Sequence, residues 1–101
     1  MIARMWHGST RPADADRYVA HLRHTVIPEL SSIAGYRGIQ VLRRVQGERV
    51  EFLVMTLWES MDAIRGFAGQ DIDVAVVTRE AQALLSDYDR HAAHYEVPLS
   101  L

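Results

Sequence analysis

Hydrophobic positions are densest between Arg49 and Ser60, where Thr56 alone interrupts an apolar run from Phe52 to Trp58. Aromatic and β-branched residues in such a run favour a strand, and alternate side chains point to opposite faces. One face carries Val50, Phe52, Val54, Thr56 and Trp58, and the other carries Glu51, Leu53, Met55 and Leu57. Because both faces are largely apolar, we expect either a central strand of a sheet or a strand whose second face is covered by another subunit.

Three further stretches predict strands. Residues Ile2–Ser9 alternate between apolar and polar side chains, and Tyr36–Val45 precedes the central stretch. The dipeptide Gln46-Gly47 between the last two runs indicates a tight hairpin turn. A final alternating segment, Tyr88–Leu99, predicts the last strand.

Helical patterns separate these strands. The first spans Pro12–Ile33, with apolar side chains at three- and four-residue spacing. Pro28 lacks a backbone N–H inside this pattern, so we expect a kink or a short break there. Ser60 suits the cap of a second helix. The runs Ile72–Val77 and Thr78–Leu85 are predicted to add helical turns, although the valines of the first run weaken that interpretation.

The resulting order, β-α-β-β-α-β, is typical of the ferredoxin-like α+β fold. In that fold, a four-stranded antiparallel sheet carries both helices on one face. The other face would remain open and would carry several apolar side chains, which predicts association with a second copy through the sheet faces. The chain length of 101 residues predicts one domain over residues 1–101.

Composition narrows the classes of function. The chain is 49% hydrophobic and 24% charged, as expected of a folded protein. Its net charge of -2 and the lack of a long basic run argue against a nucleic-acid binder. The chain has no cysteine, which excludes disulfides and thiolate metal sites and fits the cytoplasm. We expect neither a signal peptide nor a membrane span.

Four segments occur in a characteristic order, and the most specific is a Trp-Glu-Ser triplet after a strand, followed by an Ala-Ile-x-x-Phe helix. The segments are Met1–Trp6, Arg37–Arg44, Leu57–Gly69 and His94–Val97. They resemble the antibiotic biosynthesis monooxygenase-like family of the dimeric α+β barrel superfamily. The resemblance covers most of the chain and is weakest between Val77 and Asp87. It implies a homodimer and a cavity between the sheet and the helices of each subunit.

The resemblance also implies chemistry. Oxygenases of that family oxidise quinol- or anthrone-like rings with O₂ and without a metal or flavin, because the deprotonated ring is electron-rich. The expected function is therefore a cofactor-independent monooxygenase acting on a small hydrophobic cyclic substrate. The family holds several other activities, so a non-catalytic small-molecule binder or a structural dimer is the alternative.

A haem-degrading branch of the same family suggests a third function, that of a variant haem-binding or haem-degrading protein. Its members carry an Asn on the first strand, a Trp on the second helix and an axial His beyond it. The matching positions here are His7, Phe67 and Val77. Valine cannot bind iron, so a haem protein would require a different geometry.

One histidine is the candidate base. His7 has an unperturbed pKa near neutrality and could accept a proton if its face of the first strand looks into the cavity. The alternative is that His7 is a strand-end histidine in solvent or a hydrogen-bonded core residue without a catalytic role. The predicted substrate pocket comprises Trp6, Tyr18, His24, Trp58, Phe67 and His94. Trp58 also suits a packing role in the core, and no converging set of ligands predicts a metal site.

Overall fold

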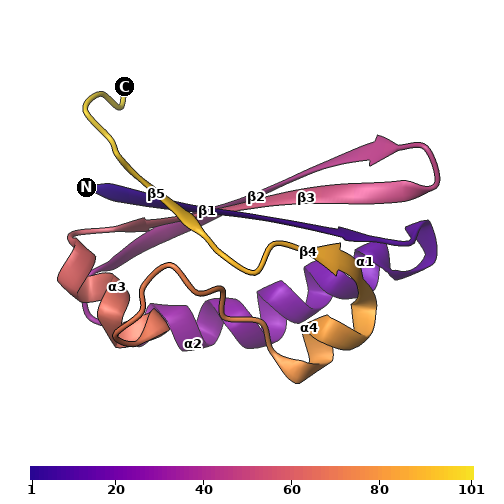
Figure 1. Cartoon of the computed structure of the whole chain (residues 1–101), viewed down its shortest axis with the longest axis horizontal. Coiled ribbons are helices and arrows are strands. Elements are labelled where there is room, and N and C mark those ends of the chain that lie inside the picture. Colours follow the sequence, from indigo (N-terminus) through magenta and orange to yellow (C-terminus); the bar gives the residue numbers. More distant parts are fainter.

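The computed structural model describes residues 1–101, and the helices lie on one side of the long strands (Figure 1). The strands are β1 (Ile2–Thr10), β2 (Tyr36–Gln46), β3 (Arg49–Trp58), β4 (Leu85–Tyr88) and β5 (Ala93–Glu96). The helical segments are α1 (Pro12–His21), the π-helical turn η1 (Leu22–Val26), α2 (Ile27–Ser31), α3 (Met61–Ala68) and α4 (Arg79–Leu84). The predicted α+β, ferredoxin-like class with an antiparallel sheet is confirmed.

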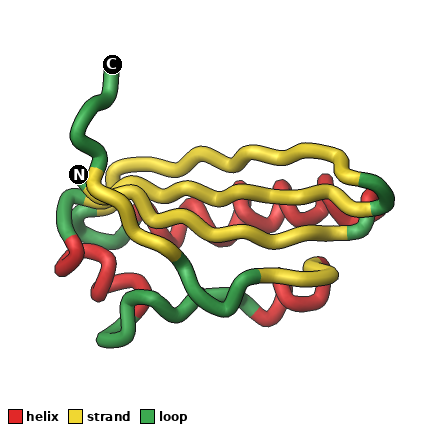
Figure 2. Tube along the Cα trace, turned by 45° about the horizontal axis from the view of Figure 1, so that its top comes forward, coloured by secondary structure: helices red, strands yellow, loops and turns green.

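The sheet has the strand order β2-β3-β1, and both β4 and β5 pair with the remaining edge of β1. β4 pairs along Gly8–Thr10 and β5 along Ile2–Met5, so together they form one interrupted fourth strand (Figure 2). The prediction of an unbroken strand over Tyr88–Leu99 is therefore wrong. The interruption arises because the backbone of residues 90–92 bonds to residues 73–75 instead of to β1.

The long first helix is irregular where proline was expected to disturb it. The Ile27 N–H donates to the carbonyl of Leu22, five residues earlier, and this bond defines the π-helical turn η1. Pro28 follows directly and has no N–H to donate to the carbonyl of His24. The wider turn accommodates this missing bond, and the helix continues as α2 without a break in its path (Figure 1).

The inner face of β3 is buried as the alternation predicts. Phe52 and Trp58 have no exposed surface, and they anchor two apolar clusters between the sheet and the helices. Tyr18 packs edge-on against Phe52 with the ring centres 4.8 Å apart, while Leu30 and Ile64 pack around Trp58. Full burial of a side chain as large as Phe contributes about 1.5–3 kcal/mol.

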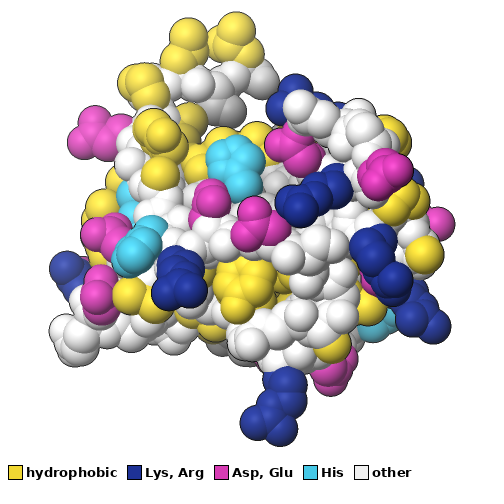
Figure 3. Space-filling model, turned by 45° about the vertical axis from the view of Figure 1, so that its right-hand side comes forward, with side chains coloured by type: hydrophobic (Ala, Val, Ile, Leu, Met, Phe, Trp, Pro, Cys, Tyr) yellow, Lys and Arg dark blue, Asp and Glu magenta, His cyan; other side chains and the backbone are white.

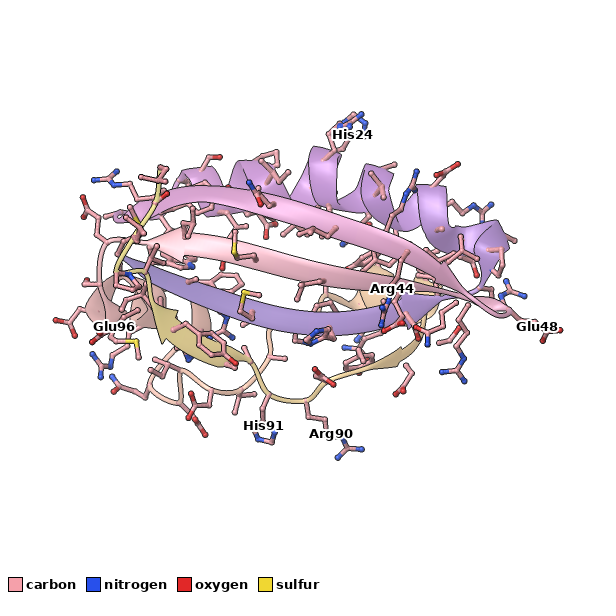
Figure 4. The ribbon with its side chains drawn as sticks, turned by 90° about the horizontal axis from the view of Figure 1, so that it is seen from above. His24, Arg44, Glu48, Arg90, His91 and Glu96 are labelled. Carbon is pink, nitrogen blue, oxygen red and sulfur yellow. The ribbon has the colours of Figure 1, made fainter.

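The outer face of the sheet carries no helix, as the view onto it in Figure 4 shows. We call it the open face and define it by Leu42, Leu53, Met55, Leu57 and Tyr95. The three β3 side chains are only half-buried, and Leu42 and Tyr95 are 48% and 58% exposed. The protomer therefore presents an apolar surface over several adjacent strands.

The segment between α3 and α4 differs from the prediction. Residues Ile72–Val77 are not helical but run in an irregular path, with an isolated β-bridge between Val74 and His91. The Arg4 side chain donates to the carbonyls of Ile72 and Val74. A helix would use those carbonyls internally, and β-branched residues favour extended backbone, so the tertiary contacts determine this path.

The surface carries charges of both signs. Acidic and basic side chains are interspersed on the face shown in Figure 3, so no single-sign field develops there. Exposed ion pairs such as Arg43–Asp16 at 2.9 Å and Arg44–Glu51 at 3.1 Å each contribute little to stability. None of the helices has the length and apolar character that crossing a membrane requires.

Candidate functional site

A cavity of about 300 Å³ lies between the inner face of the sheet and the helices. Its walls come from β1, β2, β3, the first helix, α3, α4 and the segment before α4. Thirteen of its 17 lining residues are hydrophobic, which suits an apolar ligand. Its volume lies at the lower end of the roughly 300–1,000 Å³ range of small-molecule pockets, so the ligand must be compact.

Three of the predicted aromatic residues line this cavity: Trp6, Tyr18 and Phe67. The Trp6 indole N–H donates to the carbonyl of Asp89 at 2.7 Å, which fixes the ring across Gly8. A Cβ atom on that glycine would lie 2.8 Å from the indole, so no larger residue fits there. Burial raises the pKa of the Tyr18 phenol, which therefore remains a neutral hydrogen-bond donor.

One buried cation also lines the cavity. Arg4 is 5% exposed and donates to the carbonyls of Ile72 and Val74, while its Nη1 lies 2.8 Å from Nε2 of His94. The guanidinium carbon lies 5.6 Å from the centre of the Phe67 ring. Burial lowers the Arg4 pKa, the nearby charge of Asp73 opposes this effect only in part, and no carboxylate is in direct contact with the guanidinium. A buried cation without a carboxylate in direct contact favours a ligand that carries negative charge.

The histidine behind Arg4 orients the guanidinium. The His94 side chain is 5% exposed, and its Nδ1 lies 3.3 Å from the carboxylate of Asp73. Burial and then the Arg4 cation lower the His94 pKa, and they outweigh the opposing effect of Asp73. Neutral His94 therefore presents an Nε2 lone pair to Arg4 and its Nδ1–H to Asp73. His94 does not itself line the cavity.

The candidate base lies on the other side of the sheet. His7 pairs in register with Leu53 on the open face, and its side chain is 60% exposed. Its Nδ1 lies 3.3 Å from the carboxylate of Asp89. Because strand side chains alternate, the register that places Trp6 in the cavity places His7 outside it. His7 could act as the base only if its face of β1 looked into the cavity, and in the protomer that face looks away from it.

Two other predicted pocket residues lie away from the cavity. Trp58 is fully buried in the core, donates its indole N–H to Thr56 Oγ1 at 2.8 Å and stacks on Phe67. His24 is exposed and projects outward from η1, away from the sheet (Figure 4). The predicted pocket thus separates into three lining aromatics, one histidine behind Arg4, one core residue and one surface residue.

Polar groups in the cavity wall were not identified from the sequence. The strand pattern does place Arg4 on the same face as Ile2 and Trp6, and a charged residue on a buried face is a recognisable signal. Thr78 also lines the cavity, with buried His21 directly behind it. No periodic pattern reveals Thr78, because it lies in a segment whose path depends on tertiary contacts.

A family model for antibiotic biosynthesis monooxygenases matches residues 1–72. The match extends from β1 through α3 and covers more than two thirds of the chain. The chain belongs to the antibiotic biosynthesis monooxygenase family. The matched region excludes α4, β4 and β5, which complete the cavity and the sheet. A comparison with curated proteins finds no match.

Solved structures of family members and related proteins share the fold. A Bacillus cereus protein assigned by name to the antibiotic biosynthesis monooxygenases is 18% identical, with a TM-score of 0.70 over 100% of this chain and 94% of that one. A haem degrader from Mycobacterium tuberculosis, solved with two haems in its active site, is 20% identical, with a TM-score of 0.64 over 100% and 99% of the chains. A Streptomyces coelicolor monooxygenase in complex with nanaomycin D is 14% identical, with a TM-score of 0.62 over 99% and 89%.

The donor set at this cavity does not fit haem. Val77, the position matched to the axial histidine, lines the cavity, and its side chain has no atom that can bind iron. Phe67 stands at the matched tryptophan position and also lines the cavity. No histidine is among the lining residues, and no group of three His, Cys, Asp or Glu side chains converges as a metal site.

Proposed function

We propose that this protein is a cofactor-independent monooxygenase that oxidises a small hydrophobic cyclic substrate of the quinol or anthrone type. One observation carries the proposal: the apolar cavity of about 300 Å³ contains a single buried cation, Arg4, whose guanidinium has no carboxylate in direct contact. Apolar walls recognise the ring, and Arg4 recognises the negative charge that the ring acquires when it loses a proton. Membership of the family supports the reaction class.

The reaction balances without an added reductant. For an anthrone-type methylene, R₂CH₂ + O₂ gives R₂C=O + H₂O. The methylene first loses a proton, and the negative charge spreads to the ring oxygen, where Arg4 stabilises it. The anion then donates electrons to O₂ and forms a peroxide at the same carbon. Loss of water from that peroxide leaves the new carbonyl, so one oxygen atom enters the product and the other enters water.

Three side chains prepare this site. The Tyr18 hydroxyl remains protonated because burial raises its pKa, so it can donate a hydrogen bond to the bound oxyanion. Trp6 and Phe67 provide flat apolar surfaces for the ring and exclude bulk water. The lack of cysteine is compatible with the reducing cytoplasm, where we expect this activity.

We also propose that the protein forms a homodimer through its open face. Leu53, Met55 and Leu57 form an apolar row along β3, flanked by exposed Leu42 and Tyr95. A second sheet packed on this face would remove these side chains from water. The cavity lies on the opposite face, so each protomer would retain its own site.

The function is tested with anthrone and an oxygen electrode. We expect wild-type protein to consume one O₂ for each anthraquinone formed, and metal chelators to leave the rate unchanged. Ala75→Phe should abolish the activity because it fills the cavity, whereas Ala83→Phe adds the same ring to an exposed position of α4 and should have little effect. Anthrone that binds in the cavity without O₂ uptake would identify a non-catalytic binder and refute the proposal.

A further inference from the structure

A buried histidine stands behind the cavity wall at the end of α1. His21 has a side chain that is 4% exposed, and its Nε2 lies 2.8 Å from Oγ1 of Thr78. On the other side of the ring, Nδ1 lies 3.2 Å from a carboxylate oxygen of Glu80. The order hydroxyl, imidazole, carboxylate is that of an activated hydroxyl group, in which each member orients the next.

The neighbours of the imidazole determine where its proton lies. A carboxylate only accepts hydrogen bonds, so Glu80 favours the proton on Nδ1 of His21. Nε2 is then a lone pair and accepts from the Thr78 hydroxyl. The Thr78 oxygen already accepts from the Ala81 N–H at 3.1 Å as the cap of α4, so its own proton is free to point at His21.

One atom of this arrangement is incompletely satisfied. His21 Nδ1 is the only buried side-chain nitrogen or oxygen in the chain without an aligned hydrogen bond, although Glu80 lies at 3.2 Å. The Glu80 side chain is 75% exposed and can rotate into line. A positive charge on the imidazole would strengthen this contact, because a neutral hydrogen bond would become a charge-assisted one.

Thr78 connects this arrangement to the ligand space. It lines the cavity, as does Tyr18, which lies one helical turn before His21. The proposed oxygenase requires a group that accepts the methylene proton, and no histidine lines the cavity. Thr78 and Glu80 both lie beyond residue 72, where the match to the family model ends. This arrangement is therefore not part of the matched family pattern.

We propose that Thr78 and His21 form the proton relay that deprotonates the substrate of the proposed monooxygenase, an inference that rests on that function. Thr78 is the catalytic residue, and His21 is the positioning residue that acts through it. The methylene proton passes to Thr78 Oγ1 as the hydroxyl proton passes to His21 Nε2. His21 later returns this proton through Thr78 to the peroxide anion formed with O₂. The peroxide then loses water, and both residues regain their starting state.

Few charged side chains lie near the His21 imidazole. Glu80 from α4 is the one charged side chain within ion-pair distance of the imidazole. On its own helical path, Arg17 and His24 lie about one turn away by sequence. Among the inward positions of the packed strands β1 and β3, only Arg4 is charged, and it is held by the segment before α4. Glu80 is therefore the one charged group placed to orient the imidazole.

The relay is tested without oxygen, by the exchange of anthrone methylene protons for deuterium in D₂O, followed by NMR. We expect wild-type protein to accelerate exchange over buffer at least tenfold. His21→Gln should lower the rate at least tenfold. Thr78→Ser keeps both the hydroxyl and the cap and should retain exchange, whereas Thr78→Ala should lose it. Melting temperatures establish that each variant is folded.

The outcomes separate the two proposals. Exchange by the wild type without O₂ uptake in air would support the relay and refute the monooxygenase. Anthrone oxidation that is equally fast in wild type and His21→Gln, or in Thr78→Ala, would refute the relay and leave the monooxygenase standing. Exchange no faster than in buffer would also refute the relay. If His21→Gln does not fold, the comparison of Thr78→Ser with Thr78→Ala decides.

Discussion

Arg4→Met should destabilise the fold by releasing the segment between α3 and α4. The guanidinium donates to the carbonyls of Ile72 and Val74 and contacts His94, so one side chain attaches this segment and β5 to the first half of β1. Methionine has a similar length but no donor. The substitution leaves these three acceptors without their partner, while the apolar stem of the side chain is largely preserved.

The magnitude follows from the number and burial of the lost bonds. Hydrogen bonds to charged groups contribute about 1.5–3 kcal/mol each. The acceptors here are partly buried and can be reached by water, so about 1 kcal/mol for each is more realistic. The loss of a cation whose pKa is lowered by burial offsets part of this cost. We expect a net loss of about 2 kcal/mol in the free energy of unfolding, or roughly 8–16 °C in Tm.

Urea unfolding measures this loss, and hydrogen exchange locates it. Amides of Ala75 and Ala92, which bond between the segment and residues 90–92, should lose protection first in Arg4→Met. Arg43→Met is the matched control, because Arg43 forms an exposed ion pair with Asp16 and should cost less than about 0.5 kcal/mol. Equal stability of the two variants would show that Arg4 does not hold the segment.

Three other predictions follow from contacts in the fold. Burial and the Arg4 cation lower the His94 pKa from its ordinary value of 6.5, so the folded protein binds its proton less readily than the unfolded chain. The stability that neutral His94 contributes should be fully present above pH 6.5 and should decrease as the pH falls below it. His94→Gln should remove this pH dependence from the free energy of unfolding measured in urea, and an unchanged dependence would show that another group causes it. Val77→His should give a Soret shift on addition of haem, while the wild type should not; a shift in the wild type would contradict the absence of a ligand. Met55→Arg on the open face should convert dimer to monomer in analytical ultracentrifugation, whereas Val45→Arg at the exposed hairpin end should not; a dimeric Met55→Arg would refute this interface.

Local patterns predicted the long elements well because their hydrophobic faces coincide with their buried faces. The central strand ends at Trp58 and the second helix starts after Ser60 as expected, and the hairpin turn lies one residue further along than predicted, at Gly47-Glu48. The pattern failed over Ile72–Val77, where apolar residues indicate burial but not conformation. There, bonds from Arg4 and from residues 90–92, distant in the sequence, select an irregular path over a helix.

The difference between local sequence patterns and tertiary contacts also explains which site residues could be predicted. Aromatic residues are conspicuous in a sequence and were found, since Trp6, Tyr18 and Phe67 all line the cavity. His7 was chosen for its chemistry, yet its place depends on a one-residue register that chemistry does not reveal. Thr78 could not be found, because an isolated threonine acquires meaning only from its neighbour in space.

The cavity is assembled from two parts of the chain that constrain each other. β1 provides Arg4, which needs acceptors to be buried, and the segment before α4 provides those carbonyls. Once held, the segment leads into α4 at Thr78 and thereby brings its hydroxyl to His21. The proposed anion-binding end and the proposed proton-accepting end of the cavity are therefore connected through one short stretch of backbone. Loosening the Arg4 end should slow proton transfer at the Thr78 end, and deuterium exchange in Arg4→Lys, which keeps the charge but not the fork of donors, would measure that coupling.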